Sequence, residues 1–509
     1  MSGGARWTGL GLSTNLAVGG APDPFAILQD APDAFDYVEY SAPLDVDQAR
    51  REAPAFAALE AGRARGTPAL FHPVHLNLYG PELEAAESLR ALDAHARAVG
   101  SPWVGNDVAW WHAGGVPFPG YLYVPPPLSE DGLADCALHA RHVQAALSMP
   151  LLLENPAVIA RRGTMHVLEL MARLHEATGC GLILDLGHLL SFQLSAGLPP
   201  GASLGGFPLE AVREIHVAGG AVTRVAHREL YLDDHSLPVR EEVFGLLRQV
   251  LPGCTALEAV TFEGDGHPDA AAKVTLRSLR DLVPRERRAP EPPPPPRRAA
   301  GPGPRDGRLR TDPWAILREV LAGEGPDPLG ARVELEYRLA VLAEELDRAW
   351  PMSRPLLLPD RAALAAFSRS EELWDAFHGA PGGVPGAFAR HARRQLHRRP
   401  DEGAAAAHAF ELWAHSALDR ADPPGVRRGS FPVDLSELWH AVRAVRRHAL
   451  GRAMVSGSLD GSERDVLAQV ARRARPGPWE VALRREGGRL FVQSLAPRGG
   501  IRPGPPRAR

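Results

Sequence analysis

The sequence predicts an α/β protein with a (β/α)8 TIM barrel at its N-terminus and a mainly α-helical C-terminal domain. Eight short apolar strand patterns alternate with longer amphipathic helix patterns, which favours parallel strands joined by right-handed crossovers. Over this length the natural closure is a barrel. A doubly wound open sheet is the alternative, but no glycine-rich phosphate-binding fingerprint follows the first strand.

The predicted strands are short apolar runs separated by helix-spaced patterns. Leu182 to Leu184 show the continuous apolar run of a strand that is buried on both faces. Helical spacing is clear in VDQARREAPAFAALEAGRA and PELEAAESLRALDAHARAVG. In chain order, the strands span residues 10–14, 37–40, 69–72, 103–107, 151–154, 182–185, 214–217 and 257–263.

A proline- and arginine-rich run, PRERRAPEPPPPPRRAAGPGPRDGRLR, divides the chain and is typical of an extended linker. We predict a barrel at residues 1–283, a linker at 284–311 and a helical domain at 312–509. In the last domain, segments such as ARVELEYRLAVLAEELDRAW and LSELWHAVRAVRRHALGRAM carry apolar residues at helical spacing. The segment WEVALRREGGRLFVQSLA predicts a terminal β-hairpin that turns at Gly487 and Gly488.

Charge and apolar patterning argue against several classes of protein. The formal net charge is −4 over 509 residues, so we expect no nucleic-acid partner. We find neither a secretory signal nor an apolar run long enough for a bilayer, and expect no membrane association. The three cysteines form no CxxC pair and no disulfide framework, which favours a cytoplasmic protein.

Ligand-type side chains recur at the ends of consecutive predicted strands. In a parallel barrel these ends meet at one mouth, where active sites are built. A single Asp there is more often a helix cap and a single His a packed core residue, but unpaired buried charges are costly and the pattern repeats. We therefore predict a metal site formed by His72, Asp107, Glu154, Asp185, His188, His216, Asp233, His235 and Glu263.

The chemistry of these ligands limits the metal. Imidazoles combined with carboxylates suit iron, zinc or manganese better than calcium or magnesium. So many ligands exceed the roughly three or four protein groups that one catalytic ion takes. We expect two or three ions, bridged by a carboxylate such as Glu154 or Glu263.

The motifs, taken in order, resemble those of the multinuclear non-haem iron-dependent oxidases (DUF692), whose best-known member acts in methanobactin biosynthesis. The similar segments are FHPVHLNLYG, LLLENP, TGCGLILDLGH, EIHVAGG, LDDHSLPV and FEGDG, with GLGLSTN and YVEY nearer the N-terminus. The resemblance spans roughly residues 8–283 and implies a xylose-isomerase-like barrel with two or three irons in mixed valence. It implies iron ligation by His72, Glu154, Asp185, His216, Asp233, His235 and Glu263, with catalytic roles for all of these except Asp185.

The resemblance implies an enzyme that uses O2 to oxidise a side chain, most often cysteine, of a ribosomally made precursor peptide. It also implies a small partner or fused domain that presents the peptide. The C-terminal helices could take this role, or they could be a stabilising appendage. Two residues depart from the family's usual pattern, Asp107 in place of His and His188 in place of Asn, and both can still ligate a metal.

Two other functions remain open on the sequence. His188 after Asp185 also resembles the Asp-x-x-His of AP endonucleases of the endonuclease IV type, so a zinc- or manganese-dependent phosphodiesterase or sugar isomerase is the alternative. A degenerate barrel that serves as a scaffold is the third. The segment from Trp110 to Glu130 is interpreted as a lid or peptide-binding surface, with Tyr121 and Tyr123 as contacts, or as a packed loop.

Overall fold

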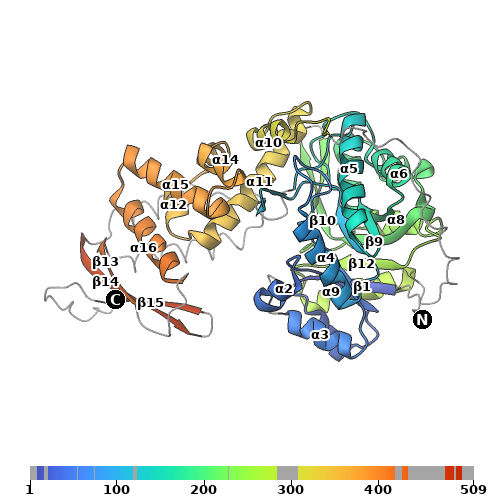
Figure 1. Cartoon of the computed structure of the whole chain (residues 1–509), viewed down its shortest axis with the longest axis horizontal. Helices are drawn as coiled ribbons and strands as arrows, with labels where there is room; N and C mark the ends of the chain where they lie inside the picture. The colour runs from blue at the N-terminus through green and yellow to red at the C-terminus, as the bar shows by residue number, and fades with distance from the viewer. Residues whose placement is uncertain are drawn as a thin grey trace. The chain divides into compact units, whose positions relative to one another are not determined.

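The computed structural model describes residues 9–16, 21–53, 55–73, 75–118, 123–226, 228–283, 308–418, 427–433, 476–486 and 489–495. The chain forms two compact units (Figure 1). The first contains residues 1–112 and 123–334, and the second contains residues 113–122 and 335–509. Most of the predicted linker lies outside the described residues, and residues 308–334 belong to the first unit.

The first unit contains a closed barrel of eight parallel strands, which confirms the predicted fold. Every predicted strand is present, with bounds that differ by at most two residues. The apolar runs show no alternation because both faces are covered: Leu151, Leu152 and Leu153 have no exposed surface. Around the barrel, the strands are β1 (Gly9–Asn15), β2 (Tyr37–Ser41), β3 (Ala69–Phe71), β4 (Val104–Asp107), β7 (Leu151–Glu154), β8 (Gly181–Asp185), β9 (Val212–Ala218) and β12 (Ala259–Glu263), which pairs with β1.

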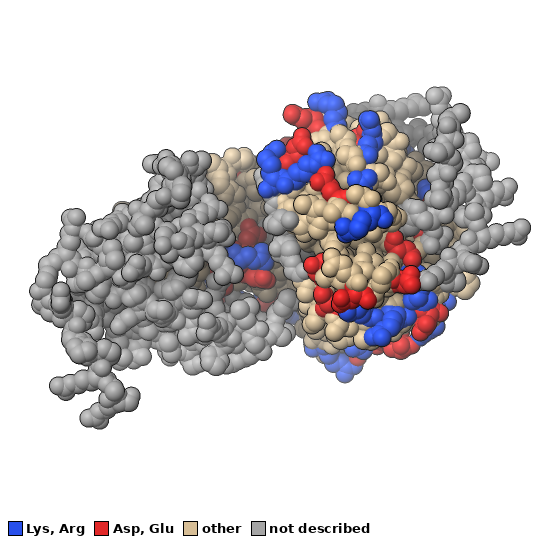
Figure 2. Space-filling view, turned by 90° about the horizontal axis from the view of Figure 1, so that it is seen from below, with Lys and Arg blue, Asp and Glu red and all other residues tan. Residues whose placement is uncertain are grey.

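Amphipathic helices surround this barrel (Figure 1). Helix α4 buries Leu89, Leu92 and Val99 and ends at Gly100, whose φ of 69° supplies the left-handed C-cap. The helices are α1 (Pro24–Asp30), α2 (Val46–Glu52), α3 (Phe56–Ala64), α4 (Ala86–Val99), α5 (Glu130–Ala146), α6 (Val167–Thr178), α7 (Leu186–Ala196), α8 (Glu241–Val250) and α9 (Asp269–Leu282), with 3-10 turns at Leu204–Gly206 and Leu209–Ala211. Figure 2 shows one face of the barrel, on which basic and acidic side chains are interspersed.

Two hairpins lie outside the barrel ladder. Strands β5 (His112–Ala113) and β6 (Val116–Pro117) follow β4, and strands β10 (Gly220–Val225) and β11 (Arg228–Asp233) follow β9. The first hairpin falls in the segment interpreted as a lid. There, Trp110 and Trp111 are buried in the first unit.

The same segment also contributes to the second unit. Phe118 packs edge-on against Phe377, with ring centroids 5.0 Å apart. Tyr121 lies outside the described residues, and Tyr123 is buried in the first unit.

The C-terminal part is mainly helical, as predicted. Its helices are α10 (Pro313–Ala322), α11 (Pro328–Ala349), α12 (Ser353–Leu357), α13 (Arg361–Ser368), α14 (Glu371–Phe377), α15 (Gly383–Arg398) and α16 (Glu402–Leu418). Phe367, Phe377 and Phe388 form part of the buried core of the second unit. No helix in the described ranges has both the length and the apolar character needed to cross a membrane.

The predicted terminal hairpin is confirmed as β14 (Pro476–Glu486) and β15 (Arg489–Leu495), which pair antiparallel. The turn residues and the helix predicted within residues 435–454 lie outside the described residues. A third strand, β13 (Arg427–Val433), pairs with β14 and was not predicted. Its sequence, RRGSFPV, lacks the alternation of a half-buried strand and contains both Gly and Pro.

Candidate metal centre

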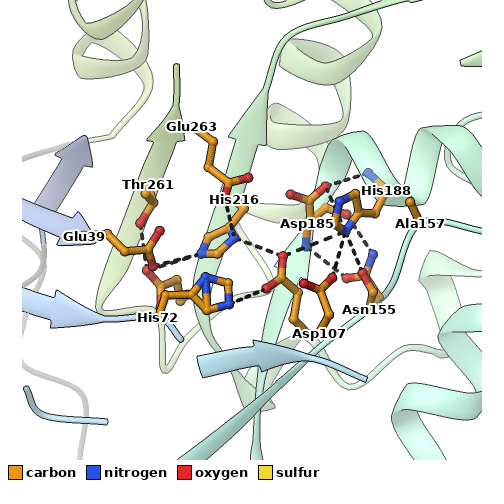
Figure 3. A network of polar contacts seen from close by, with 12 residues as sticks. Glu39, His72, Asp107, Asn155, Ala157, Asp185, His188, His216, Thr261 and Glu263 are labelled. Atoms are coloured by element: carbon orange, nitrogen blue, oxygen red, sulfur yellow. Dashed lines mark hydrogen bonds and ion pairs between the residues drawn. The ribbon is translucent and has the colours of Figure 1, made fainter. Parts of the chain in front are cut away.

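The nine predicted ligands lie close together at the C-terminal mouth of the barrel. Figure 3 shows His72, Asp107, Asp185, His188, His216 and Glu263 turned toward one another. The parallel register places Asp107 beside Glu154 and Asp185 beside His216, so the side chains of neighbouring strands meet. With Glu39 of β2, which the sequence analysis missed, we call this set the metal-centre cluster. Its members are Glu39, His72, Asp107, Glu154, Asp185, His188, His216, Asp233, His235 and Glu263.

Glu154 links the imidazoles of one half of the cluster. Its Oε2 lies 3.1 Å from Nε2 of His72, and its Oε1 lies 3.0 Å from Nδ1 of His216. Oε1 of Glu263 is 3.7 Å from the same His216 nitrogen. Glu154 is 1% exposed, so its carboxylate meets protein groups rather than bulk water. This position suits a carboxylate that bridges two ions.

His188, in the first turn of α7, organises the other half. Its Nδ1 lies 3.4 Å from Oδ1 of Asp107, and its Nε2 lies 3.3 Å from Oδ2 of Asp233. Nε2 of His235 is 3.2 Å from the same Asp233 oxygen and 3.8 Å from Oε2 of Glu263. The two residues that depart from the family pattern in the sequence, Asp107 and His188, therefore face each other.

Asp185 shows that a helix cap and a ligand can be the same residue. Its Oδ1 accepts the backbone N–H of His188 and caps α7, which is the ordinary role of a strand-end Asp. Its Oδ2 is buried with no hydrogen-bond partner among the described residues. Asn155 fixes the backbone of Asp185 with two hydrogen bonds of 2.9 Å. One oxygen therefore positions the helix, and the other is not occupied by that role.

The donor set fits metal ions. Besides Asp185, Glu39 and Asp233 each have a buried carboxylate oxygen for which the described part of the chain offers no hydrogen-bond donor. Such oxygens are costly to bury unless a cation compensates them. The potential ligands form three groups, and within each group the ligand atoms lie within 4.8 Å of one another. The groups are Glu39, His72, His216 and Glu263; His72, Asp107 and Glu154; and Glu154, Asp185 and His188. The groups share His72 and Glu154, as expected for adjacent ions.

The pKa values of the cluster reflect its excess of carboxylates. Burial raises the pKa of Glu154 and brings that of Glu263 to about 7. Burial alone would lower the pKa values of His188 and His216, but the surrounding carboxylates raise both well above the ordinary value. Burial and the neighbouring His216 lower the pKa of His72 to about 3. A bound divalent ion would displace the protons that these groups otherwise share.

A second set of buried polar residues lies on or directly before the barrel strands, next to His216, and we call it the lower cluster. It consists of Tyr37, Trp103, Glu214 and Thr261. The Trp103 indole donates to Oε2 of Glu214 at 2.8 Å, and the Thr261 hydroxyl donates to Oε1 at 2.7 Å. The single proton of the Thr261 hydroxyl is used in the bond to Glu214, so the Tyr37 hydroxyl must donate to the Thr261 hydroxyl oxygen, 2.7 Å away.

The lower cluster and Glu39 contact the far nitrogen of His216. Its Nε2 lies 3.3 Å from Oε2 of Glu39 and 3.6 Å from Oε1 of Glu214. These contacts orient the ring so that Nδ1 faces Glu154 and Glu263. The sequence contains a signal for both acids: Glu39 is the one charge inside YVEYS, and Glu214 is two positions from His216, on the same face of β9.

Residues 19–277 match the family described as RiPP precursor modification enzyme MbnB/TglH/ChrH. A UPF0276 protein of Bordetella parapertussis is 32% identical over 266 residues, which are 52% of this chain and 90% of that protein. A UPF0276 protein of Caulobacter vibrioides is 29% identical over 181 residues, 35% of this chain and 62% of that protein.

Solved structures also align with the chain. A xylose isomerase domain protein from Alicyclobacillus acidocaldarius is 20% identical, with a TM-score of 0.36, and the alignment covers 54% of this chain and 98% of that protein. Endonuclease IV from Thermus thermophilus is 17% identical, with a TM-score of 0.33 and the same two coverages.

Proposed function

Because the chain belongs to the family of RiPP precursor modification enzymes MbnB/TglH/ChrH, we propose that it is a multinuclear iron-dependent oxidase. It would use O2 to oxidise a side chain of a ribosomally synthesised precursor peptide, and we propose cysteine as that residue. Family membership supports the peptide substrate. The observation that supports a multinuclear metal centre is the set of three overlapping ligand groups that share His72 and Glu154.

The chain offers ligands for more than one ion. One ion would be held by His72, His216 and Glu263 with Glu39, and others by Glu154 with His72 and Asp107 or with Asp185 and His188. Asp233 lies 3.3 Å from His188, and His235 lies 3.8 Å from Glu263. When bound, iron in mixed valence supplies the one-electron and O2 chemistry that amino-acid side chains lack.

The residues around the cluster orient the ligands and keep out water. Glu39 and Glu214 hold the His216 ring, and Asn155 holds the backbone of Asp185. Trp111 and Tyr123 form a buried wall on the loop after β4, with ring centroids 4.7 Å apart. The Tyr123 hydroxyl accepts the N–H of Ala157, three residues after Glu154, at 2.7 Å. This arrangement shields reactive groups from bulk water.

The C-terminal helices and the three-stranded sheet are proposed to recognise the leader of the precursor peptide, in place of a separate partner protein. This follows the domain organisation predicted from the sequence, in which a barrel is followed by a mainly helical domain, and a cytoplasmic location fits the same proposal. A pull-down of the precursor peptide that persists after deletion of residues 335–509, the C-terminal part of the second unit, would argue against it.

A zinc- or manganese-dependent phosphodiesterase or sugar isomerase is the second candidate. It is favoured by one observation: Asp185 and His188 lie with Glu154 in a single ligand group, and zinc and manganese accept the same ligand types as iron.

Metal content decides between the two candidates. Protein isolated without oxygen from cells supplied with iron-57 should show two or more coupled irons per chain by Mössbauer spectroscopy. Zinc in stoichiometric amount without iron would favour the hydrolase or isomerase. Absence of any metal would contradict both candidates and favour a degenerate barrel that serves as a scaffold.

A double variant tests the ligand assignment. Asp233→Ala combined with His235→Ala should lose iron, because both side chains face the cluster. Asp234→Ala is the matched control, since this intervening carboxylate is turned to Ser236, whose backbone N–H and hydroxyl it accepts. Full iron retention in the double variant would refute the assignment of these two residues.

A further inference from the structure

Residues 308–334, which we call the strap, lie beyond the family match but belong to the barrel unit. The strap contains α10 and the first residues of α11. It contacts the barrel unit at several separate points: the loop after His72, the loop after Asp107 and helix α5 beyond it, the loop after Glu154, and strand β11, which ends at Asp233. This distribution raises the question of what the strap does for the cluster.

The first contact is made by Thr311. Its backbone N–H and its hydroxyl donate to Oδ2 of Asp135 in α5, at 2.9 and 2.7 Å, and the N–H of Arg310 donates to the other oxygen at 2.8 Å. The Tyr79 hydroxyl, on the loop after His72, lies 2.9 Å from the Thr311 hydroxyl. Asp135 is 1% exposed, so these bonds are shielded from water.

Trp314 makes the second contact. Its ring packs edge-on against Trp110, with centroids 5.0 Å apart. Trp110 lies three residues after Asp107, on the loop that follows β4. The strap is therefore packed against the loops that follow both His72 and Asp107.

The third contact is ionic and lies at the other end of the strap. Asp327 accepts Nη1 of Arg228 through both oxygens, at 2.9 and 2.8 Å. Glu334 and Glu319 lie 3.4 and 3.7 Å from the guanidinium of Arg162, on the loop after Glu154. Asp327 is 9% exposed, so its pairing with Arg228 is stronger than that of a surface pair.

Arg228 gives the strap a route to the metal centre. Asp233 and His235 are not on barrel strands: Asp233 ends β11, and β10 and β11 form a separate two-stranded sheet. A two-stranded hairpin is marginally stable by itself. Helix α7 supports its middle, where the Ser191 hydroxyl donates to the Tyr231 carbonyl at 3.0 Å. Arg228 pairs with Val225 at the tip of the hairpin, and the strap supports this tip.

We propose that the strap holds hairpin β10–β11 in place, and that Asp327 is thereby a positioning residue for Asp233 and His235. The other members of the cluster stand on strands held by the barrel ladder or next to such strands, so they need the strap less. The inference rests on the proposed metal-dependent function for its effect on ion binding, and on the described contacts alone for its effect on the hairpin.

The test uses Asp327→Asn and Arg228→Gln in the full-length protein. Asp327 also lies 3.9 Å from the Arg161 guanidinium and accepts the N–H of Gly330 at the start of α11. Asn can still accept the Gly330 N–H, so the first variant removes the ion pairs with Arg228 and Arg161 but keeps the cap. Arg228→Gln breaks the pair from the hairpin side. Glu229→Gln is the matched control, because Glu229 forms an exposed pair with Arg224 in the same hairpin.

Hydrogen exchange of the metal-free protein is measured first. Amide protection of residues 220–225 and 228–233 should fall about tenfold or more in both strap variants and stay unchanged in the control. Iron affinity, measured by competition with a chelator, should then fall about tenfold, as for other supporting residues of metal sites.

Unchanged exchange in both variants overturns the proposal. Faster exchange with unchanged iron affinity overturns the positioning role of Asp327. A wild-type protein that binds no iron is a failure of the proposed function, and the exchange measurement still decides whether the strap holds the hairpin.

Discussion

The metal-centre cluster and the lower cluster contain the same kinds of buried group, but they differ in how their oxygens are satisfied. Glu154 and Glu214 are both 1% exposed. Both Glu214 oxygens accept hydrogen bonds from neutral donors, at 2.8 and 2.7 Å. In the metal-centre cluster, oxygens of Glu39, Asp185 and Asp233 have no donor among the described residues. Both clusters are therefore buried, and they differ in whether their carboxylate oxygens have hydrogen-bond donors.

The pKa values of Glu154 and Glu214 also differ. Burial raises the pKa of Glu154 above its ordinary value. Burial acts on Glu214 too, but the His216 imidazole, 3.6 Å away, and the hydrogen bonds from Thr261 and Trp103 hold its pKa below the ordinary value. A buried glutamate is therefore no sign of function by itself. A group of buried carboxylates without donors indicates that a cation completes the site.

Glu154→Gln should give the largest effect on metal binding, since Glu154 belongs to two of the three ligand groups. We expect iron affinity to fall at least 100-fold, about 3 kcal/mol. The free energy of unfolding of the metal-free variant should differ from that of the metal-free wild type by less than about 1 kcal/mol. The reason is that an amide of equal size replaces a carboxylate that is costly to bury as an anion. Chelator competition and urea unfolding measure the two quantities. A large loss of stability without metal would make Glu154 a structural residue and cancel the contrast with Glu214.

Glu214→Gln should show the opposite order of effects. Removing the charge weakens the hydrogen bonds from Trp103 and Thr261 and leaves a buried amide with imperfect partners, which costs about 2 kcal/mol of unfolding free energy. Iron affinity should fall about tenfold, because the His216 ring loses one of its supports. Thr261→Val, which removes one donor to Glu214, is the companion variant. If Glu214→Gln unfolds at the wild-type urea concentration, the lower cluster does not stabilise the barrel as argued.

The sequence predicted the barrel because each strand carries its own local signal. A continuous apolar run such as Leu182 to Leu184 requires burial on both faces, and a helix-spaced pattern after each strand requires a crossover. Closure then follows from the number of units. Strand β13 had no such local signal, because its pairing with β14 depends on a partner distant in the sequence.

The prediction of the site depended on strand ends, which explains what it found and what it missed. Residues that end strands, such as Glu154 and Glu263, converge because parallel strands end at one mouth. Glu39 and Glu214 lie inside strands, where a charge is easily taken for an exception. The facing of Asp107 and His188 could not be predicted, since it depends on where the end of β4 lies relative to the first turn of α7. The strap was also missed, because composition marks a linker but not where the chain beyond it packs.

His95 provides the smallest effect and tests whether burial acts alone. It has no exposed surface and belongs to neither cluster. Nδ1 lies 3.1 Å from the Pro43 carbonyl and must carry the proton, so Nε2 accepts the Tyr40 hydroxyl at 3.0 Å. Burial lowers the pKa of His95 to about 4.

The sign of the pH dependence follows from this lowered pKa. The unfolded chain, in which a histidine has a pKa of about 6.5, takes up a proton before the folded one does, so acid favours unfolding. Between pH 7 and about 5.5, the free energy of unfolding should fall by about 1 kcal/mol more in the wild type than in His95→Gln, which does not titrate. Urea unfolding of the metal-free proteins at the two pH values measures the difference. Parallel pH curves would show that His95 is not held neutral by its surroundings. They would also weaken the wider inference that the surroundings of a buried polar group in this barrel set its protonation state. The contrast between Glu154 and Glu214 depends on that inference.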